Sequence, residues 1–164
     1  MAAELARRVG AAPAHIEEGI RRVKWPGRLE RIGDVLLDGA HNADGAAALA
    51  AHVRTLGVPA EPVALVFGAL ADKDWAPMLD VLAPVAHRRF YVPAAGASRA
   101  AADPQAMAAR VPGEVCASVE DALQAAAHAR PIAPALRIVC GSLLTVGQAR
   151  ASLLGLPRDP PVAL

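Results

Sequence analysis

The chain has 164 residues, a length that fits one domain with a closed core and is short for a two-domain enzyme. Hydrophobic residues make up 54% of it and aromatic residues only 3%, so we expect a core of Ala, Val, Leu and Ile. The net charge of +1 comes from dispersed arginines without a basic run, and no apolar stretch is long enough to span a bilayer. These features argue against nucleic-acid and membrane partners.

Two cysteines, Cys116 and Cys140, both fall in apolar, strand-like runs. Cysteines in such positions are more often small buried residues than members of a disulfide or a metal site. The first four residues also lack the order of a signal peptide. We therefore expect a protein of the cytoplasm.

The chain begins with two short helical patterns, over residues 3–9 and 14–23, which a Gly-Ala-Ala-Pro stretch separates. Residues 28–32 are then expected to form an extra strand. Gly33-Asp34 is a strong hairpin signal that turns this strand back into the next one, at residues 35–37. The extra strand should therefore run antiparallel to its neighbour, at an edge of the sheet.

Five apolar strand candidates recur with helical segments between them, at residues 35–37, 63–67, 89–92, 115–117 and 138–140. The helices are expected at 44–56, from near 72, after Asp103-Pro104, after Ser118 and at about 145–154. Such alternation predicts βαβ units. The expected fold is a three-layer α/β/α, Rossmann-like sandwich with a mostly parallel sheet and one antiparallel edge strand.

The motif Trp25-Pro26-Gly27-Arg28 places an arginine directly after a Pro-Gly turn. Such a turn presents the guanidinium in a defined direction, and its planar set of donors suits a phosphate. Taken alone, an arginine on an edge strand is more often a solvated surface residue. Only the motif as a unit favours the phosphate-binding interpretation.

The motif Asp38-Gly39-Ala40-His41-Asn42 follows directly on an apolar strand. In open α/β sheets, ligands bind at the carboxyl ends of the strands. His41 and Asn42 stand at the start of the next helix, which is a favourable site for an anion. Helix capping accounts for Asp38 or Asn42 taken singly, but not for the ordered set.

Two later strand exits are less specific. The capping of a helix explains Asp72-Lys73-Asp74, although Lys73 could instead pair with a carboxylate near the strand ends. Gly141-Ser142 can offer a hydroxyl and backbone N–H groups to a substrate carboxylate, or it can simply begin a helix. No Gly-Lys-[Ser/Thr] phosphate loop, Gly-x-Gly-x-x-Gly motif or zinc-ligand spacing occurs, so no metal ligand is assigned.

These two motifs, together with residues 141–150, resemble the C-terminal domain of folylpolyglutamate synthase/dihydrofolate synthase, a branch of the Mur ligase superfamily. The resemblance implies a Mur-ligase-type C-terminal domain over residues 25–155. It also implies that residues 1–24 are a helical remnant of a preceding ATPase domain or linker. Residues 156–164 are then expected to be a frayed tail.

The same resemblance implies a carbon–nitrogen ligase that adds L-glutamate to dihydropteroate or folyl-glutamate through an acyl phosphate. Arg28 and His41 are implied as catalytic residues. Arg28, Asp38 and Asn42 are implied in ATP binding, and His41 and Ser142 in glutamate binding. ATP and Mg²⁺ would be held mainly by the ATPase domain of the same parent chain, so we expect these 164 residues alone to be inactive.

Two alternatives stay open from the sequence. A peptidoglycan Mur ligase domain fits the motifs less well than the folate branch does. A non-catalytic α/β module, which binds a nucleotide or a protein, would use the same residues as caps and turn formers.

Overall fold

The computed structural model describes residues 2–23, 25–57, 63–94, 96, 99–129 and 135–157. The elements in chain order are α1 (Ala2–Arg8), α2 (Pro13–Arg22), β1 (Glu30–Ile32), β2 (Val35–Leu37), α3 (Ala43–Thr55), β3 (Val63–Phe67), α4 (Trp75–Leu82), the 3-10 helix η1 (Ala83–Val85), β4 (Arg88–Tyr91), α5 (Pro104–Arg110), β5 (Glu114–Val115), α6 (Val119–Ala127), β6 (Leu136–Cys140) and α7 (Leu143–Leu154). None of the helices in the described part of the chain has both the length and the apolar character of a transmembrane segment.

The six strands form one sheet in the order β1-β2-β6-β3-β4-β5. β1 pairs antiparallel with β2, and every other neighbouring pair is parallel. The predicted α/β fold, with a mostly parallel sheet and an antiparallel edge strand, is confirmed. Because β2, β6 and β3 are parallel neighbours, their carboxyl ends meet at one edge of the sheet, which we call the mouth.

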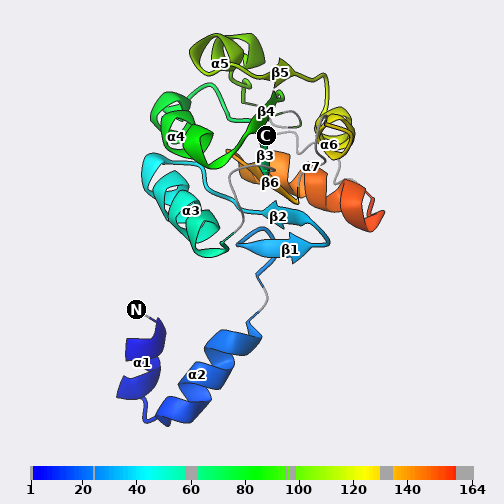
Figure 1. Ribbon diagram of the computed structural model, residues 1–164. Coiled ribbons are helices and arrows are strands. Elements are labelled where there is room, and N and C mark those ends of the chain that lie inside the picture. The colour runs from blue at the N-terminus through cyan, green and yellow to red at the C-terminus, as the bar shows by residue number, and fades with distance from the viewer. Residues whose placement is uncertain are drawn as a thin grey trace.

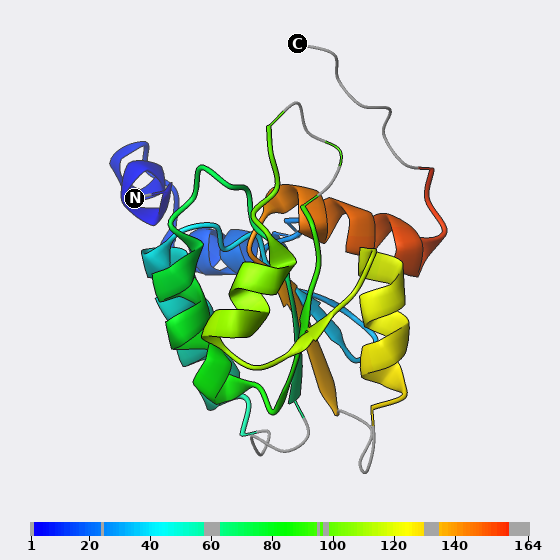
Figure 2. The ribbon, with the colours of Figure 1, turned by 90° about the horizontal axis from the view of Figure 1, so that it is seen from above.

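Helices cover both faces of the sheet and complete the three layers (Figures 1 and 2). α3, α4 and α5 lie on one face, and α6 and α7 on the other. Successive strand residues point to opposite faces. Leu36 and Leu65 accordingly join the core beneath α3 and α4, whereas Leu37 and Val66 join the core beneath α6 and α7.

Two strands are shorter than the sequence pattern indicates. The strand expected at 28–32 begins only at Glu30, because residues 28 and 29 belong to a turn: the N–H of Arg28 donates to the carbonyl of Trp25 at 3.0 Å. The strand expected at 115–117 is the two-residue edge strand β5, Glu114–Val115. The N–H of Cys116 still donates to the carbonyl of Tyr91, at 2.9 Å, so the chain stays aligned with β4 there.

Helices α1 and α2 lie apart from the sheet and its covering helices (Figure 1). Both were expected from the sequence, and each lies within one residue of its expected bounds. Leu5 of α1, Ile20 of α2 and Val9, directly after α1, are more than half exposed. The assignment of both helices to a preceding domain stays a prediction. Lys24 and residues 158–164 of the expected tail lie outside the described residues.

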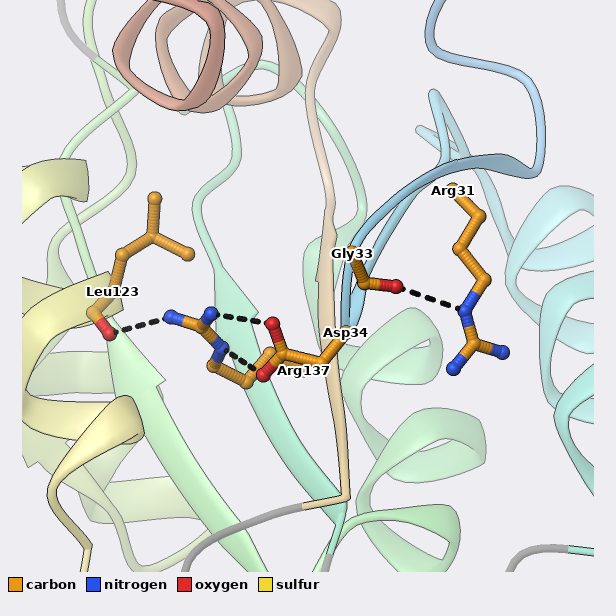
Figure 3. Close-up of polar contacts among 5 residues, drawn as sticks. All are labelled: Arg31, Gly33, Asp34, Leu123 and Arg137. Carbon is orange, nitrogen blue, oxygen red and sulfur yellow. Dashed lines mark hydrogen bonds and ion pairs between the residues drawn. The ribbon is translucent and has the colours of Figure 1, made fainter.

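The end of the sheet opposite the mouth is closed by an ion pair between Asp34, in the β1–β2 turn, and Arg137 of β6 (Figure 3). Arg137 also donates to the carbonyl of Leu123 on α6, at 3.1 Å. One side chain therefore joins the hairpin, the central strand and a covering helix.

Both cysteines are free thiols, and both are buried as expected. Burial raises the pKa of the Cys140 thiol far above its ordinary range, and the nearby Asp38 carboxylate adds to the effect. A thiol in this state is a poor nucleophile. Cys140 is therefore a packing residue beneath the mouth.

Candidate functional site

Backbone hydrogen bonds join the three loops that leave β2, β3 and β6 at the mouth. The N–H of Asp38 donates to the carbonyl of Val139 at 3.0 Å, and the N–H of Gly141 donates to the carbonyl of Ala40 at 3.0 Å. The N–H of Gly68 reaches the carbonyl of Cys140 at 3.2 Å. The strand ends are thus held side by side, and the loops that carry Asp38, His41 and Ser142 are joined by their backbones.

Asp38 is a buried carboxylate, 8% exposed, at the end of β2. One oxygen accepts the N–H of Leu29 at 3.0 Å, and the other accepts the N–H of Ala40 at 2.9 Å. Each oxygen already has a backbone donor, which satisfies the buried charge. Asp38 therefore joins the turn before β1 to the loop after β2.

Arg28 is carried by residues 25–29, which we call the Arg28 turn. Gly27 has a φ of 69°, in the left-handed region that glycine adopts without strain. Its carbonyl accepts the N–H of Gly39 at 2.7 Å, so the turn lies directly against the loop that contains His41. The Arg28 side chain is exposed and makes no hydrogen bond or ion pair with the described residues. Its five donors are thus not used within the described part of the chain, and the turn that carries it lies at the mouth.

His41 is half-buried, and its Nδ1 lies 2.8 Å from the carbonyl oxygen of Gly39. A carbonyl can only accept, so Nδ1 carries the proton of this hydrogen bond. In the neutral ring the lone pair then lies on Nε2. His41 is therefore oriented by the backbone with one nitrogen left to act as an acceptor.

Asn42 and Ser142 both occupy the N-cap positions of helices. The Oδ1 of Asn42 accepts the N–H of Gly45 at 2.8 Å and caps α3. The Oγ of Ser142 accepts the N–H of Leu144 at 3.2 Å and caps α7. Asn42 is exposed, whereas Ser142 is 4% exposed. Both residues are therefore helix caps, as the capping interpretation predicted. Each cap uses an oxygen as acceptor, so the side-chain amide nitrogen of Asn42 and the hydroxyl proton of Ser142 can still donate to a ligand.

His41 and Ser142 line the same cavity of about 230 Å³, which we call the mouth cavity. The two positive side chains of Lys73 and Arg99 line it as well. Leu70, Gly141, Leu143 and Leu144 complete its walls. The cavity thus combines an imidazole, a hydroxyl and two basic side chains.

Arg99 was missed by the sequence reasoning. It lies in the loop after β4, whose backbone pairs with the loop after β3: the N–H of Ala71 donates to the carbonyl of Ala100 at 2.9 Å. Arg99 also forms an ion pair with Asp72. The signal in the sequence was the position of this loop, because β4 is parallel to β3 and ends at the same edge of the sheet.

The helix cap expected from Asp72 or Asp74 is not formed. Asp74 occupies the N-cap position of α4 but makes no side-chain cap hydrogen bond, and Asp72 is engaged by Arg99. Lys73 makes no hydrogen bond or ion pair through its side chain with the described residues. Of these three loop residues, Lys73 lines the mouth cavity, and Asp72 contacts it only through its ion pair with Arg99.

Within the described ranges, no three side chains of His, Cys, Asp or Glu are grouped closely enough to hold a metal ion. A second cavity of about 260 Å³ lies between α6 and α7, against Leu123, Arg137 and Leu153. It contains none of the residues that the motifs single out.

The α/β fold and the loops at the mouth are those of a known protein family. Residues 27–143 match the family model of the Mur ligase glutamate ligase domain, and the chain belongs to this family. Within it, the chain is 35% identical over 147 residues to folylpolyglutamate synthase of Lacticaseibacillus casei, a match that covers 87% of this chain and 33% of that protein. The chain thus spans about a third of the length of this relative.

Solved structures agree with this result. The folylpolyglutamate synthase of Mycobacterium tuberculosis, complexed with ADP and AMPPCP, has a TM-score of 0.76 at 28% identity, over 94% of this chain and 38% of that one. The bifunctional folylpolyglutamate synthase/dihydrofolate synthase with Mn, AMPPNP and L-glutamate bound has a TM-score of 0.73 at 28% identity, over 89% and 36%. The predicted resemblance is confirmed, and the comparisons favour it over a stand-alone module.

Proposed function

We propose that this chain is the glutamate ligase domain of a larger folate-pathway amide ligase, which adds L-glutamate to dihydropteroate or folyl-glutamate at the expense of ATP. The observation that carries the proposal is the joint placement of the Arg28 turn and the mouth cavity at the ends of β2 and β6. A phosphate-binding arginine and a cationic amino-acid pocket thereby share one edge of the sheet. The named relatives support the choice of the folate branch.

In this reaction a substrate carboxylate takes the γ-phosphoryl group of ATP and becomes an acyl phosphate, with release of ADP. The amine of L-glutamate attacks the acyl carbon, and phosphate leaves as the amide forms. Such chemistry depends on neutralised phosphate charge and on orientation in a closed site. Arg28, whose side chain is exposed at the mouth, is proposed to contact the phosphoryl group.

The amine can attack only after it has lost a proton from its ammonium form. His41 is the proposed acceptor, because its Nδ1 is fixed on the carbonyl of Gly39 and its Nε2 is left with the lone pair. The buried hydroxyl of Ser142 and the cations Lys73 and Arg99 are proposed to bind the glutamate carboxylates. Each role uses a residue of the mouth cavity.

The nucleotide side of the site is proposed to involve Asp38 and Asn42 as well as Arg28. Asn42 has an exposed amide nitrogen to offer, since only its oxygen is used by the cap. Asp38 contributes chiefly by holding the loop and the Arg28 turn together.

Mg²⁺ is expected with ATP. The chain spans about a third of the length of its relative from Lacticaseibacillus casei, and we assign the metal, and most of the ATP contacts, to an ATPase domain of the same parent chain. Residues 1–24 are proposed to belong to the end of that domain. Accordingly, the 164 residues alone should show no ligase activity, and the parent enzyme should be cytoplasmic.

The proposal is tested by fusing this chain to the ATPase domain of a related synthase and measuring glutamate-dependent phosphate release from ATP. We expect Arg28→Ala and His41→Ala each to lower kcat by about 100-fold. Arg31→Ala and His52→Ala are the matched controls, because Arg31 is an exposed arginine of the same hairpin and His52 lies on α3. Full activity in both mouth variants of a folded, active fusion would contradict the proposed roles.

A further inference from the structure

One face of α7 supports the loops that form the mouth. Leu143, Val146 and Arg150 are spaced three and four residues apart, so they lie on the same side of the helix. The first two press against glycines: a Cβ on Gly39 would lie 2.5 Å from Leu143, and one on Gly27 would lie 2.9 Å from Val146. The helix thus packs directly beneath the Arg28 turn.

The third residue of this face, Arg150, makes an ion pair with Glu30, the first residue of β1. The Nε of Arg150 lies 3.0 and 3.1 Å from the two carboxylate oxygens of Glu30. The side chains are 31% and 20% exposed, so the pair is partly shielded from water. A charge pair of this kind holds its geometry better than the exposed pairs Arg7–Glu4 of α1 and Arg22–Glu18 of α2.

The carboxylate of Glu30 makes a second interaction, with the Arg28 turn. Its Oε2 accepts the N–H of Gly27 at 2.7 Å, inside the Arg28 turn. The conformation of the Arg28 turn is strained, because Leu29 has a φ of 47°, in the left-handed region that a leucine rarely adopts. Contacts from outside the turn must therefore hold it, and Glu30 and Asp38 provide them.

We propose that Glu30 and Arg150 are positioning residues that fix the direction of Arg28. Arg150 orients the carboxylate of Glu30, and that carboxylate holds Gly27, the residue before Arg28. The same helix is capped by Ser142, which lines the mouth cavity. Helix α7 therefore fixes the position of Arg28 relative to that of Ser142. The catalytic consequence rests on the proposed function, whereas the effect on the turn does not.

The first test is amide hydrogen exchange of Gly27 in the 164-residue chain, followed by NMR. We expect Arg150→Gln to speed the exchange of Gly27 by about tenfold relative to core amides of β3, because the carboxylate loses its orienting partner. Arg150→Lys should keep exchange close to that of the parent chain. Arg137→Gln is the matched control, since it breaks the other hairpin ion pair at the opposite end of the sheet.

A charge-swapped chain separates positioning from simple stabilisation. Combining Glu30→Arg with Arg150→Glu restores an ion pair but leaves residue 30 without an acceptor for the N–H of Gly27. We expect fast exchange of Gly27 in this chain, even if its unfolding free energy recovers. Slow exchange in the swapped chain, unchanged exchange in Arg150→Gln, or an equal effect of Arg137→Gln would each overturn the proposal.

The second test uses the fused two-domain enzyme. If Arg150 acts through Arg28, Arg150→Gln should lower kcat by about tenfold in the parent fusion and by less than about twofold when Arg28→Ala is already present. Equal losses in both backgrounds would overturn the proposal. An inactive parent fusion would count against the proposed function alone, because the exchange of Gly27 needs no ligase activity.

Discussion

The guanidinium of Arg137 donates to both carboxylate oxygens of Asp34, with Nε 2.9 Å from Oδ2 and Nη2 2.7 Å from Oδ1 (Figure 3). The two residues are 103 positions apart in the chain. Their pairing holds the β1–β2 hairpin, which carries the Arg28 turn at its other end, against the central strand. The hydrogen bonds from Arg137 also hold the pKa of the Asp34 carboxyl below its ordinary value of 3.8.

We predict that Asp34→Asn lowers the free energy of unfolding at neutral pH by about 1–2 kcal/mol, since it leaves the mostly buried Arg137 without its anion. A lowered pKa means that the carboxylate stabilises the fold fully above pH 3.8 and loses this effect as the pH falls through the lowered value. Urea unfolding at several pH values should therefore show the variant and the parent chain converging in acid. Asp80→Asn, which breaks the exposed pair with Arg110, is the control and should have a smaller effect.

Tyr91 is the chain's single tyrosine, so its titration can be followed by absorbance without interference. Its hydroxyl donates to the carbonyl of Val111 at 2.9 Å, and burial raises its pKa from 10.0 to about 12. The neutral phenol therefore stabilises the fold fully below pH 10.0, and this contribution is lost as the pH rises toward 12. We expect tyrosinate to appear about two pH units later in the native chain than in urea. Coincident titrations would contradict the burial.

Tyr91→Phe removes the hydroxyl and keeps the ring. We expect this variant to lose about 1 kcal/mol of unfolding free energy at neutral pH. Its stability should also fall less than that of the parent chain between pH 10 and 12. A chemical unfolding series across that range measures both effects.

Gly141 lies at the exit of β6 with a φ of 103°, and a Cβ there would be 2.7 Å from the carbonyl oxygen of Gly68. We predict that Gly141→Ala lowers the free energy of unfolding by more than about 2 kcal/mol, because the backbone carbonyl of Gly68 cannot move away from the added methyl group without disturbing the sheet. Gly147→Ala is the matched control in α7, where nothing lies within 4 Å of the added Cβ. That variant should gain about 0.5–1 kcal/mol, since glycine weakens a helix interior. Thermal unfolding of both variants measures the contrast.

Two substitutions at Asn42 can separate helix capping from nucleotide binding. Asn42→Ala should cost about 1 kcal/mol of unfolding free energy, because the N–H of Gly45 loses its acceptor. Asn42→Asp keeps the acceptor, so its stability should match that of the parent chain. In the two-domain fusion, however, the added negative charge should raise the KM for ATP. An unchanged KM in the aspartate variant would restrict Asn42 to capping.

Local patterns predicted the elements of the fold well. Helix α3 follows its Asn42 cap to within one residue of the expected start, and Asp103 and Ser118 cap their helices as expected. The order of the strands could not be derived in this way. Hydrophobic periodicity identifies a strand, but it does not say which strand lies beside it.

In the candidate site, too, the sequence reveals residues in local motifs but not contacts between distant segments. Arg28, His41 and Ser142 could be found because each lies in a short motif next to a strand. The Glu30–Arg150 pair could not be found, because the two residues are far apart in the sequence. Arg99 could be suspected only from the exit of its strand, since no motif surrounds it and its partner Asp72 lies in another loop. Likewise, residues 28 and 29 leave the expected strand for a turn that Asp38 holds from another segment.

The position of β6 in the sheet also determines when the domain can take shape during synthesis. β6 lies between β2 and β3, and its Ile138 pairs with Leu36 and Leu65. Until the ribosome has made residues 136–140, no strand connects the β1–β2 hairpin to the strands β3, β4 and β5. Before that point the edges of β2 and β3 that β6 occupies in the native sheet have no strand partner. Folding therefore depends on contacts about 100 residues apart, which slow the search for the native state, and the mouth forms only when that last strand is inserted.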